Sequence, residues 1–384
     1  MPIFESILWG SIGVVLYTYG IYPAIVFILS KFVKRPERND VDKDLPSVSM
    51  VISAYNEDSV LPYKIENICS LDYPEDRIEF LFGSDGSDDE SNTILLNANL
   101  PNIKTIIFAD RRGKANILND LVPRANGEII VFSDANTMYD PDVVRKLVLH
   151  FQDPSIGGVC GELRLRINEQ SVGEIGETSY WQYESFIKRM ESNYRTLLGA
   201  TGGVYAIRKS LFKPLPVSKA IVDDFLIPME IVRRGYRVAY EPEARAYEES
   251  AGSVRGEFKR KVRIGASNFN GIKEFSDLLH PKYGFVSFGL WSHKIIRWIA
   301  PFFLFIILLC TTILRTESTL YTGLFVLQML FLALGIISFI FETRKIGLGL
   351  FGFPYYFIAM NLALFIGCFK SLFGKQRSTW TVIR

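Results

Sequence analysis

Two adjacent carboxylates, Asp223 and Asp224, stand between apolar residues in the stretch 221–225. Two negative charges in an apolar setting are costly unless they are paired or perform chemistry. A carboxylate held near a metal ion and a hydroxyl group can act as a general base. The same pair would also suit the first turn of a helix, where the helix dipole favours negative charge. The sequence leaves both interpretations open.

A second oxygen-bearing pair, Asp134 and Asn136, directly follows the apolar run 128–132. Side chains at positions i and i+2 of an extended turn can face one divalent cation. Mg²⁺ and Mn²⁺ accept such ligands together with substrate phosphates. An Asx turn is the competing explanation. The chain has three histidines and four cysteines without a CxxC pair, which argues against zinc, a disulfide framework or a His-rich metal site.

Basic residues occur where phosphate groups could be bound. Lys114 follows a glycine at the start of a predicted helix, a position suited to phosphate. Arg260 and Arg263 share one face of another predicted helix and could stabilise a leaving diphosphate. A solvated basic turn and anchoring near lipid are the alternatives for these two groups.

Two further polar segments follow predicted strands. Residues 53–57, which include Tyr55 and Glu57, could form the floor of a ligand site. Asp85 could accept hydrogen bonds from a base or ribose edge. An ordinary β–α turn and a helix cap would explain these two segments without a ligand.

These residues need a scaffold that brings strand ends together. Short apolar runs at 48–52, 78–82, 105–108, 128–132 and 157–163 have strand length and end at Pro, Gly, Asp or Asn. Helix-like stretches at 58–70, 88–97 and 113–123 alternate with them. This alternation predicts an α/β domain over residues 47–283 with a mostly parallel, doubly wound sheet. Ligands of such sheets bind at the carboxyl ends of the strands.

Long apolar segments flank this domain. Residues 1–32 contain a segment long enough to cross a bilayer and predict an N-terminal anchor. The basic linker 33–46 follows, and the positive-inside tendency places the α/β domain in the cytosol. Residues 284–297 are predicted to form an amphipathic helix that lies at the membrane interface. Residues 298–384 predict membrane crossings and a basic tail, although the sequence does not decide whether residues 346–369 cross the membrane or re-enter it.

Taken together and in this order, the motifs resemble the membrane-bound family 2 glycosyltransferases, inverting enzymes that include cellulose, chitin and hyaluronan synthases. The resemblance covers about residues 47–265. It implies a GT-A fold, a divalent cation (Mg²⁺ or Mn²⁺), a nucleotide-sugar donor, expected to be a UDP-sugar, and a glycan or polyprenyl-linked acceptor. It also implies the cell membrane as the location and polysaccharide-export proteins as partners. The net charge of +2 gives no indication of nucleic-acid binding.

The resemblance also implies a role for each matching residue. Asp224 takes the place of the catalytic base, with Asp223 beside it, and Asp134 and Asn136 match the metal motif. The nucleotide-sugar side comprises Ala54, Tyr55, Glu57, Asp85, Lys114, Arg260 and Arg263, and the acceptor side comprises Trp181, Glu184, Gly202 and Gly203.

Three departures from the family pattern matter. Ser84 and Asn136 replace aspartates, and residues 260–264 retain an arginine of the Gln-x-x-Arg-Trp motif but lack its Gln and Trp. That motif is tied to processive synthesis. The sequence therefore leaves three hypotheses: an exopolysaccharide-type transferase that adds sugars to a glycan or lipid-linked acceptor, a processive synthase that also translocates its polymer, and an inactive transferase-like scaffold.

Overall fold

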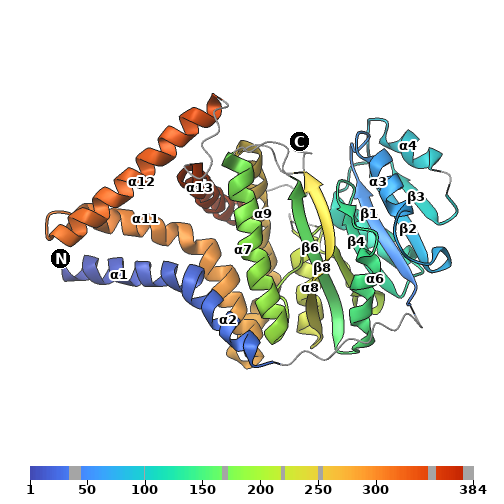
Figure 1. Ribbon diagram of the computed structural model, residues 1–384, viewed down its shortest axis with the longest axis horizontal. Helices are drawn as coiled ribbons and strands as arrows, with labels where there is room; N and C mark the ends of the chain where they lie inside the picture. The colour runs from blue at the N-terminus through green and yellow to red at the C-terminus, as the bar shows by residue number, and fades with distance from the viewer. Residues whose placement is uncertain are drawn as a thin grey trace.

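The computed structural model describes residues 1–33, 45–98, 100–166, 172–217, 221–249, 254–344 and 352–374, and an α/β unit occupies one end of it (Figure 1). Its eight-stranded sheet has the order β3-β2-β1-β4-β7-β6-β8-β5. The strands are β1 (Val48–Ala54), β2 (Ile78–Asp85), β3 (Ile103–Phe108), β4 (Ile129–Asp134), β5 (Met138–Tyr139), β6 (Ile156–Arg166), β7 (Tyr205–Arg208) and β8 (Arg237–Glu249).

The sheet is mostly parallel, as the sequence predicts. Strands β3, β2, β1 and β4 run parallel to one another, and β6 is parallel to β8. Only β7 and β5 pair antiparallel with their neighbours. Because Ser53 pairs with Asp134 and Ala54 with Ser84, the polar residues after β1, β2 and β4 meet at one edge of the sheet.

Alternating side chains of the strands fill two cores, one on each face of the sheet. Met50 and Ile52 pack into one core and Val51 into the other, as the two-residue period of a strand requires. The first core receives α3 (Leu61–Cys69), α4 (Ser91–Asn97) and α6 (Val143–Val148); the second receives α5 (Lys114–Arg124) and α8 (Asp223–Arg233).

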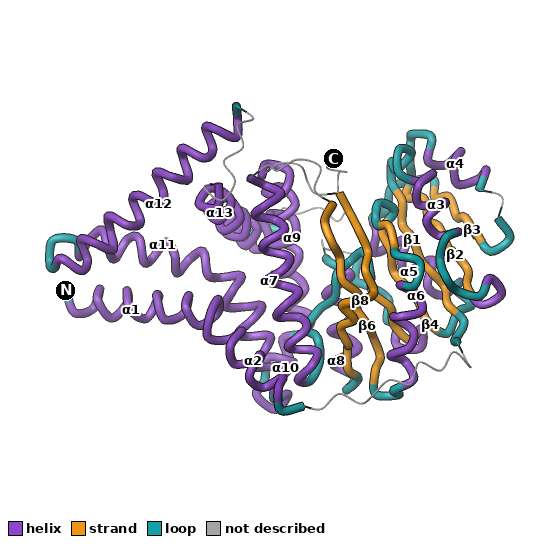
Figure 2. The backbone as a smooth tube through the Cα atoms, viewed as in Figure 1, coloured by secondary structure: helices purple, strands orange, loops and turns teal. Residues whose placement is uncertain are grey.

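Two long helices stand between the sheet and the apolar helices (Figure 2). They are α7 (Val172–Tyr194) and α9 (Val254–Glu274). Helix α7 contacts α2 and β8, and α9 packs along α13. At the α9–α13 contact a Cβ on Gly367 would lie 2.9 Å from the carbonyl oxygen of Val262, so the glycine allows the two backbones to approach closely.

Within the described residues, four helices are long and apolar enough to cross a membrane: Pro2–Lys31, Phe285–Leu314, Thr319–Thr343 and Phe353–Leu372. They comprise α1 (Pro2–Leu16) with α2 (Tyr22–Lys31), α10 (Phe285–Gly289) with α11 (Ile296–Leu314), α12 (Thr319–Thr343) and α13 (Phe353–Leu372). The first two contain π-helical stretches, which touch where Tyr17 Oη and Ser292 Oγ lie 2.6 Å apart.

Residues 285–297 do not form a separate helix. They are the first part of the 30-residue helix Phe285–Leu314, because hydrogen bonding continues through the π-helical stretch into α11, and the interfacial position of residues 284–297 stays a prediction. The last apolar segment forms α13, which is long enough to cross a bilayer. Most of the predicted basic linker, residues 34–44, and the tail residues 375–384 lie outside the described residues.

Candidate active site

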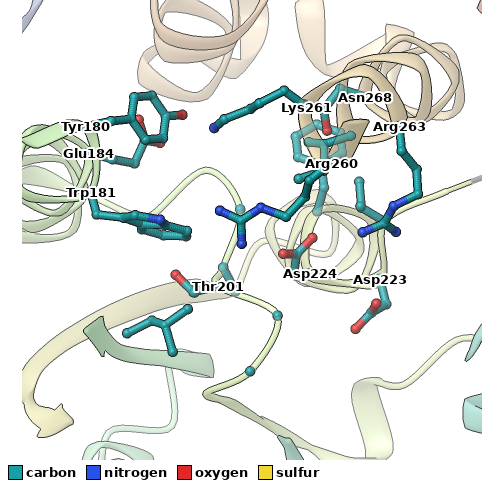
Figure 3. A pocket seen from close by; sticks show the side chains of 18 of the residues that line it. Tyr180, Trp181, Glu184, Thr201, Asp223, Asp224, Arg260, Lys261, Arg263 and Asn268 are labelled. Carbon is teal, nitrogen blue, oxygen red and sulfur yellow. The ribbon is translucent and has the colours of Figure 1, made fainter. Parts of the chain in front are cut away.

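A cavity of about 720 Å³ opens at the carboxyl edge of the sheet. The loops after β1 and β4 and the start of α8 form its inner end, α7 and α9 form its walls, and α13 closes its far side. Figure 3 shows Trp181 and Glu184 of α7 on one side, Arg260 and Arg263 of α9 on the other, and Asp224 below the two arginines. The cavity therefore connects the sheet edge with the apolar helices.

Asp223 and Asp224 are the first two residues of α8, so the dipole of this helix favours their negative charges. Asp223 is fully engaged: Tyr205 Oη donates to its Oδ2 at 2.9 Å, and Lys114 Nζ lies 3.2 Å from its Oδ1. Within the described part of the chain, Asp224 has no hydrogen-bond or ion-pair partner for its carboxylate. Its oxygens face the cavity.

The surroundings of Asp224 make it a stronger base than an ordinary aspartate. Burial, followed by the neighbouring charge of Asp223, raises the pKa of Asp224 to about 6, although Lys114 and Lys188 act in the opposite direction. A carboxylate with this pKa is still ionised at neutral pH and accepts a proton more readily. The arrangement fits general-base chemistry better than a simple helix cap.

Lys114 links the two acidic groups of the site. Its Nζ lies 2.7 Å from Asp134 Oδ1 in addition to its contact with Asp223. Gly113, with φ of 90°, places the lysine at the first residue of α5. Despite burial, the carboxylates of Asp134 and Asp223 raise the pKa of Lys114, so the ammonium stays charged. It is a fixed cation at the sheet edge.

Asp134 and Asn136 both line the cavity, as a shared cation site requires. The described residues contain no cluster of three or more His, Cys, Asp or Glu side chains that could hold a metal ion. One carboxylate and one amide nevertheless suit Mg²⁺ or Mn²⁺, which retain waters and bind substrate phosphates. A Cβ on Gly202 would lie within 4 Å of carboxylate oxygens of both Asp134 and Asp224, so these two groups border the same small space. The residues present fit such an ion.

The two arginines of α9 point into the cavity opposite α7 (Figure 3). Arg260 Nε donates to Glu257 Oε2 at 2.6 Å. Burial and the nearby charge of Arg260 lower the pKa of Arg263. Two guanidinium groups this close to each other, in a partly desolvated space, are suited to bind a diphosphate.

The small loop before β7 leaves no room for side chains. A Cβ on Gly202 would lie 3.2 Å from Asp224 Oδ2, and one on Gly203 would lie 2.5 Å from Thr137 Oγ1 and 2.7 Å from Glu248 Oε1. The glycines thus keep the space beside Asp224 open.

Glu184 lines the cavity but is engaged in a buried ion network. Arg297 Nη1 lies 2.8 Å from its Oε2, and His293 Nε2 lies 3.2 Å from its Oε1. His293 Nδ1 also lies 2.8 Å from Glu191 Oε1, and Tyr22 Oη donates a hydrogen bond to the same oxygen at 2.6 Å. The cations lower the pKa of Glu184 well below its usual range, although its burial acts against them. This residue joins α7 to the helix Phe285–Leu314, a role that the sequence did not indicate.

Three residues predicted at the nucleotide do not line the cavity. Asp85 is fully buried and accepts from the backbone N–H groups of Arg112 and Gly113 at 2.6 and 2.8 Å, so it shapes the turn before α5. Ala54 is buried in the core of the sheet. Tyr55 stacks under Arg111, whose guanidinium carbon lies 3.6 Å from the ring centre. Glu57, in contrast, reaches the cavity.

Several lining residues were not foreseen. Lys188 of α7 donates to Thr201 Oγ1 at 2.6 Å and acts on Asp224 through its charge. Glu248 near the end of β8 accepts from Thr137 Oγ1. Tyr356 and Phe357 of α13 line the far end. Nothing in the local sequence marks them, because only tertiary contacts bring these elements to the sheet edge.

The comparisons with known proteins agree with this geometry. Residues 49–215 match the model of "Glycosyl transferase family 2". The fold is GT-A: a mannosyltransferase from Pyrobaculum calidifontis, solved with GDP-Man and Mn²⁺, superposes with a TM-score of 0.74 at 19% identity. That superposition covers 97% of this chain and 100% of the mannosyltransferase.

The curated relatives with similar sequences include two polysaccharide synthases. The poly-beta-1,6-N-acetyl-D-glucosamine synthase of Staphylococcus aureus strain COL is 29% identical over 273 residues, and the match covers 68% of this chain. The enzyme of the same name from Staphylococcus epidermidis is 27% identical over 266 residues. In both cases the match spans only 62% of the relative's own length.

Proposed function

We propose that this chain transfers a sugar from a nucleotide-sugar to a glycan or lipid-linked acceptor with inversion at the anomeric carbon, in the synthesis of a cell-surface polysaccharide. The observation that carries the proposal is the position of Asp224. Its carboxylate has a raised pKa and no partner among the described residues, and it borders the same space as Asp134. A UDP-sugar is the expected donor.

In the proposed reaction, one residue acts as the base and three cations stabilise the leaving group. Asp224 takes the proton of the acceptor hydroxyl while the acceptor oxygen forms a bond to the anomeric carbon. The bond from that carbon to the diphosphate breaks, and its electron pair goes to the diphosphate oxygen. Lys114, Arg260 and Arg263 stabilise this developing charge. No covalent intermediate with the protein is needed, so an α-linked donor gives a β-linked product.

A divalent cation would be held by Asp134 and Asn136 together with the donor's phosphates. It would supply Lewis-acid stabilisation of the leaving group. The proposal is supported by the oxygen ligands at the cavity edge and by the Mn²⁺ in the structure of the mannosyltransferase of similar fold.

The acceptor enters from the side of α13. Trp181 lines the cavity, and Tyr356 and Phe357 of α13 extend the aromatic lining toward the membrane helices. Because the basic residues after the first apolar helix favour the cytosol, the domain faces the cytosol at the cell membrane. An acceptor held there would stay at the membrane, where export proteins could receive the product.

Processive synthesis is the second candidate, because the curated relatives are polymer synthases and the cavity reaches the apolar helices. A processive enzyme needs an acceptor site that holds the product between additions. Residues 260–264 lack the Gln and Trp of the family motif, so this function would depend on other aromatic groups, such as Trp181.

Nucleotide release tests the proposal. Purified protein in detergent is supplied with UDP- and GDP-sugars, lipid acceptors, and Mn²⁺, Mg²⁺ or EDTA. We expect release from one donor, dependent on the metal, and a loss of about 10²–10⁴-fold in Asp224→Asn. Full transfer by that variant would refute the role of Asp224, whereas no release from any donor would favour a scaffold. Product length, measured by chromatography, separates single addition from polymerisation.

A further inference from the structure

Lys64 is a lysine in the core. It lies on α3 with its side chain fully buried, on the same helix face as Leu61 and Ile68, which pack into the sheet. Among the described residues no carboxylate lies within ion-pair distance of its ammonium. An apolar side chain would fill this position at lower cost, because a buried cation loses its hydration. The lysine therefore calls for an explanation outside the stability of the fold.

The contacts of Lys64 supply one. Its Nζ donates to Ser133 Oγ at 2.8 Å and to the carbonyl oxygen of Thr137, and it lies 4.7 Å from the ring centre of Tyr139. Ser133 and Thr137 are the two ends of the segment 133–137, which comprises the last two residues of β4 and the three residues before β5 and is called the loop 133–137 below. That loop carries Asp134 and Asn136, and neither of them touches Lys64 through a hydrogen bond. One ammonium group thus forms hydrogen bonds to both ends of the loop from the side of the protein core.

The opposite side of the loop is held separately. Lys114 binds the carboxylate of Asp134, Thr137 Oγ1 donates to Glu248, and the Thr137 N–H donates to the carbonyl oxygen of Asp134 at 3.2 Å. A ligand that draws Lys114 toward its phosphates would remove one restraint on Asp134. The contacts of Lys64 are inaccessible to such a ligand, so they persist while the cavity fills.

We propose that Lys64 is a positioning residue of the donor site, whose ammonium fixes the loop 133–137 so that Asp134 and Asn136 present their oxygens together. The inference rests on the proposed function in one respect, namely that this loop binds a divalent cation with a nucleoside diphosphate. The ordering of the loop before binding lowers the entropy that the ion would otherwise have to overcome.

Direct cation binding tests this role without reliance on sugar transfer. Mn²⁺ is titrated into the full-length protein in detergent with UDP or GDP present, and free Mn²⁺ is measured by electron paramagnetic resonance. Lys64→Met keeps the volume of the side chain but removes both hydrogen bonds. We expect its Kd for Mn²⁺ to rise about tenfold, because the ion must then order the loop itself.

Ile68→Ala is the matched control, since it lies one turn further along the buried face of α3 and lowers stability by a cavity alone. It should lower the melting temperature and leave the Kd for Mn²⁺ unchanged. If Lys64→Met does not fold, Ser133→Ala removes one of the two loop contacts and should raise the Kd severalfold. A folded Lys64→Met or Ser133→Ala protein with the wild-type Kd would overturn the proposal.

The outcomes separate this inference from the proposed function. Wild-type protein that binds Mn²⁺ with a nucleotide but transfers no sugar refutes the function and leaves the test of Lys64 intact. Wild-type protein that binds no Mn²⁺ with either nucleotide overturns the inference itself, because the loop then positions no cation.

Discussion

The pH dependence of sugar transfer provides a sharp test of Asp224. With a pKa of about 6, this carboxylate is about 90% ionised at pH 7 and about 10% ionised at pH 5. The ionised form is the base, so kcat/KM should fall as the pH drops through 6, by about tenfold per pH unit below it. An aspartate with an ordinary pKa would remain mostly ionised at pH 5 and would give a flat profile there.

Asp223→Asn perturbs this profile in a defined direction. Its charge is the second cause of the raised pKa, after burial, so its removal should lower the pKa of Asp224. We expect the acidic limb of the profile to move to lower pH by roughly one unit. The overall rate will also drop, because Lys114 loses a partner, but the position of the limb is independent of that drop.

Initial rates of nucleotide release between pH 4.5 and 8, at low donor concentration, give kcat/KM for each variant. Tyr205→Phe is the control, because it removes a hydrogen bond to Asp223 and leaves the charge in place. A wild-type profile that stays level from pH 7 to pH 5 would refute the reasoning. So would an acidic limb that moves to higher pH in Asp223→Asn.

Three further outcomes are expected. Gly202→Ala places a methyl group 3.2 Å from Asp224 Oδ2 and should slow transfer by roughly 10²-fold at an unchanged melting temperature. Glu184→Gln leaves Arg297 without a carboxylate and should lower the free energy of unfolding by about 3 kcal/mol. The melting temperature should fall accordingly, whereas Gln182→Ala at an exposed position of the same helix should leave it unchanged. Burial lowers the pKa of Lys64 to about 7, so above that pH the folded state binds fewer protons than the unfolded state. The free energy of unfolding of the wild type, relative to that of Lys64→Met, should therefore rise by up to about 1.4 kcal/mol per pH unit between pH 7 and 10. Parallel curves of unfolding free energy against pH for the two proteins would contradict this.

The sequence alone was sufficient to predict the class of fold and the positions of the main motifs. Apolar runs of strand length alternate with helical stretches, and polar residues follow the strands, so a mostly parallel sheet with its ligands at one edge is a local consequence of residue order. Asp134, Lys114 and Asp224 lie at the same cavity for this reason.

Only the tertiary structure decided how individual side chains are used. Asp85 lies in a motif of the right kind, yet its carboxylate is occupied by two backbone N–H groups that come from a turn 27 and 28 residues later. Glu184 was expected near the acceptor, and its oxygens also meet cations from a helix more than 100 residues away. Such partners are invisible locally because they depend on how distant elements pack.

The same reason explains Lys64 and α13. In the sequence, Lys64 is one lysine among many, and its burial follows only from the packing of α3 on the sheet. Whether the last apolar segment reaches the active site depends on the close contact between α9 and α13, which Gly367 permits. Composition determined that this protein combines an α/β domain with apolar helices; long-range packing determined that the two parts share one cavity.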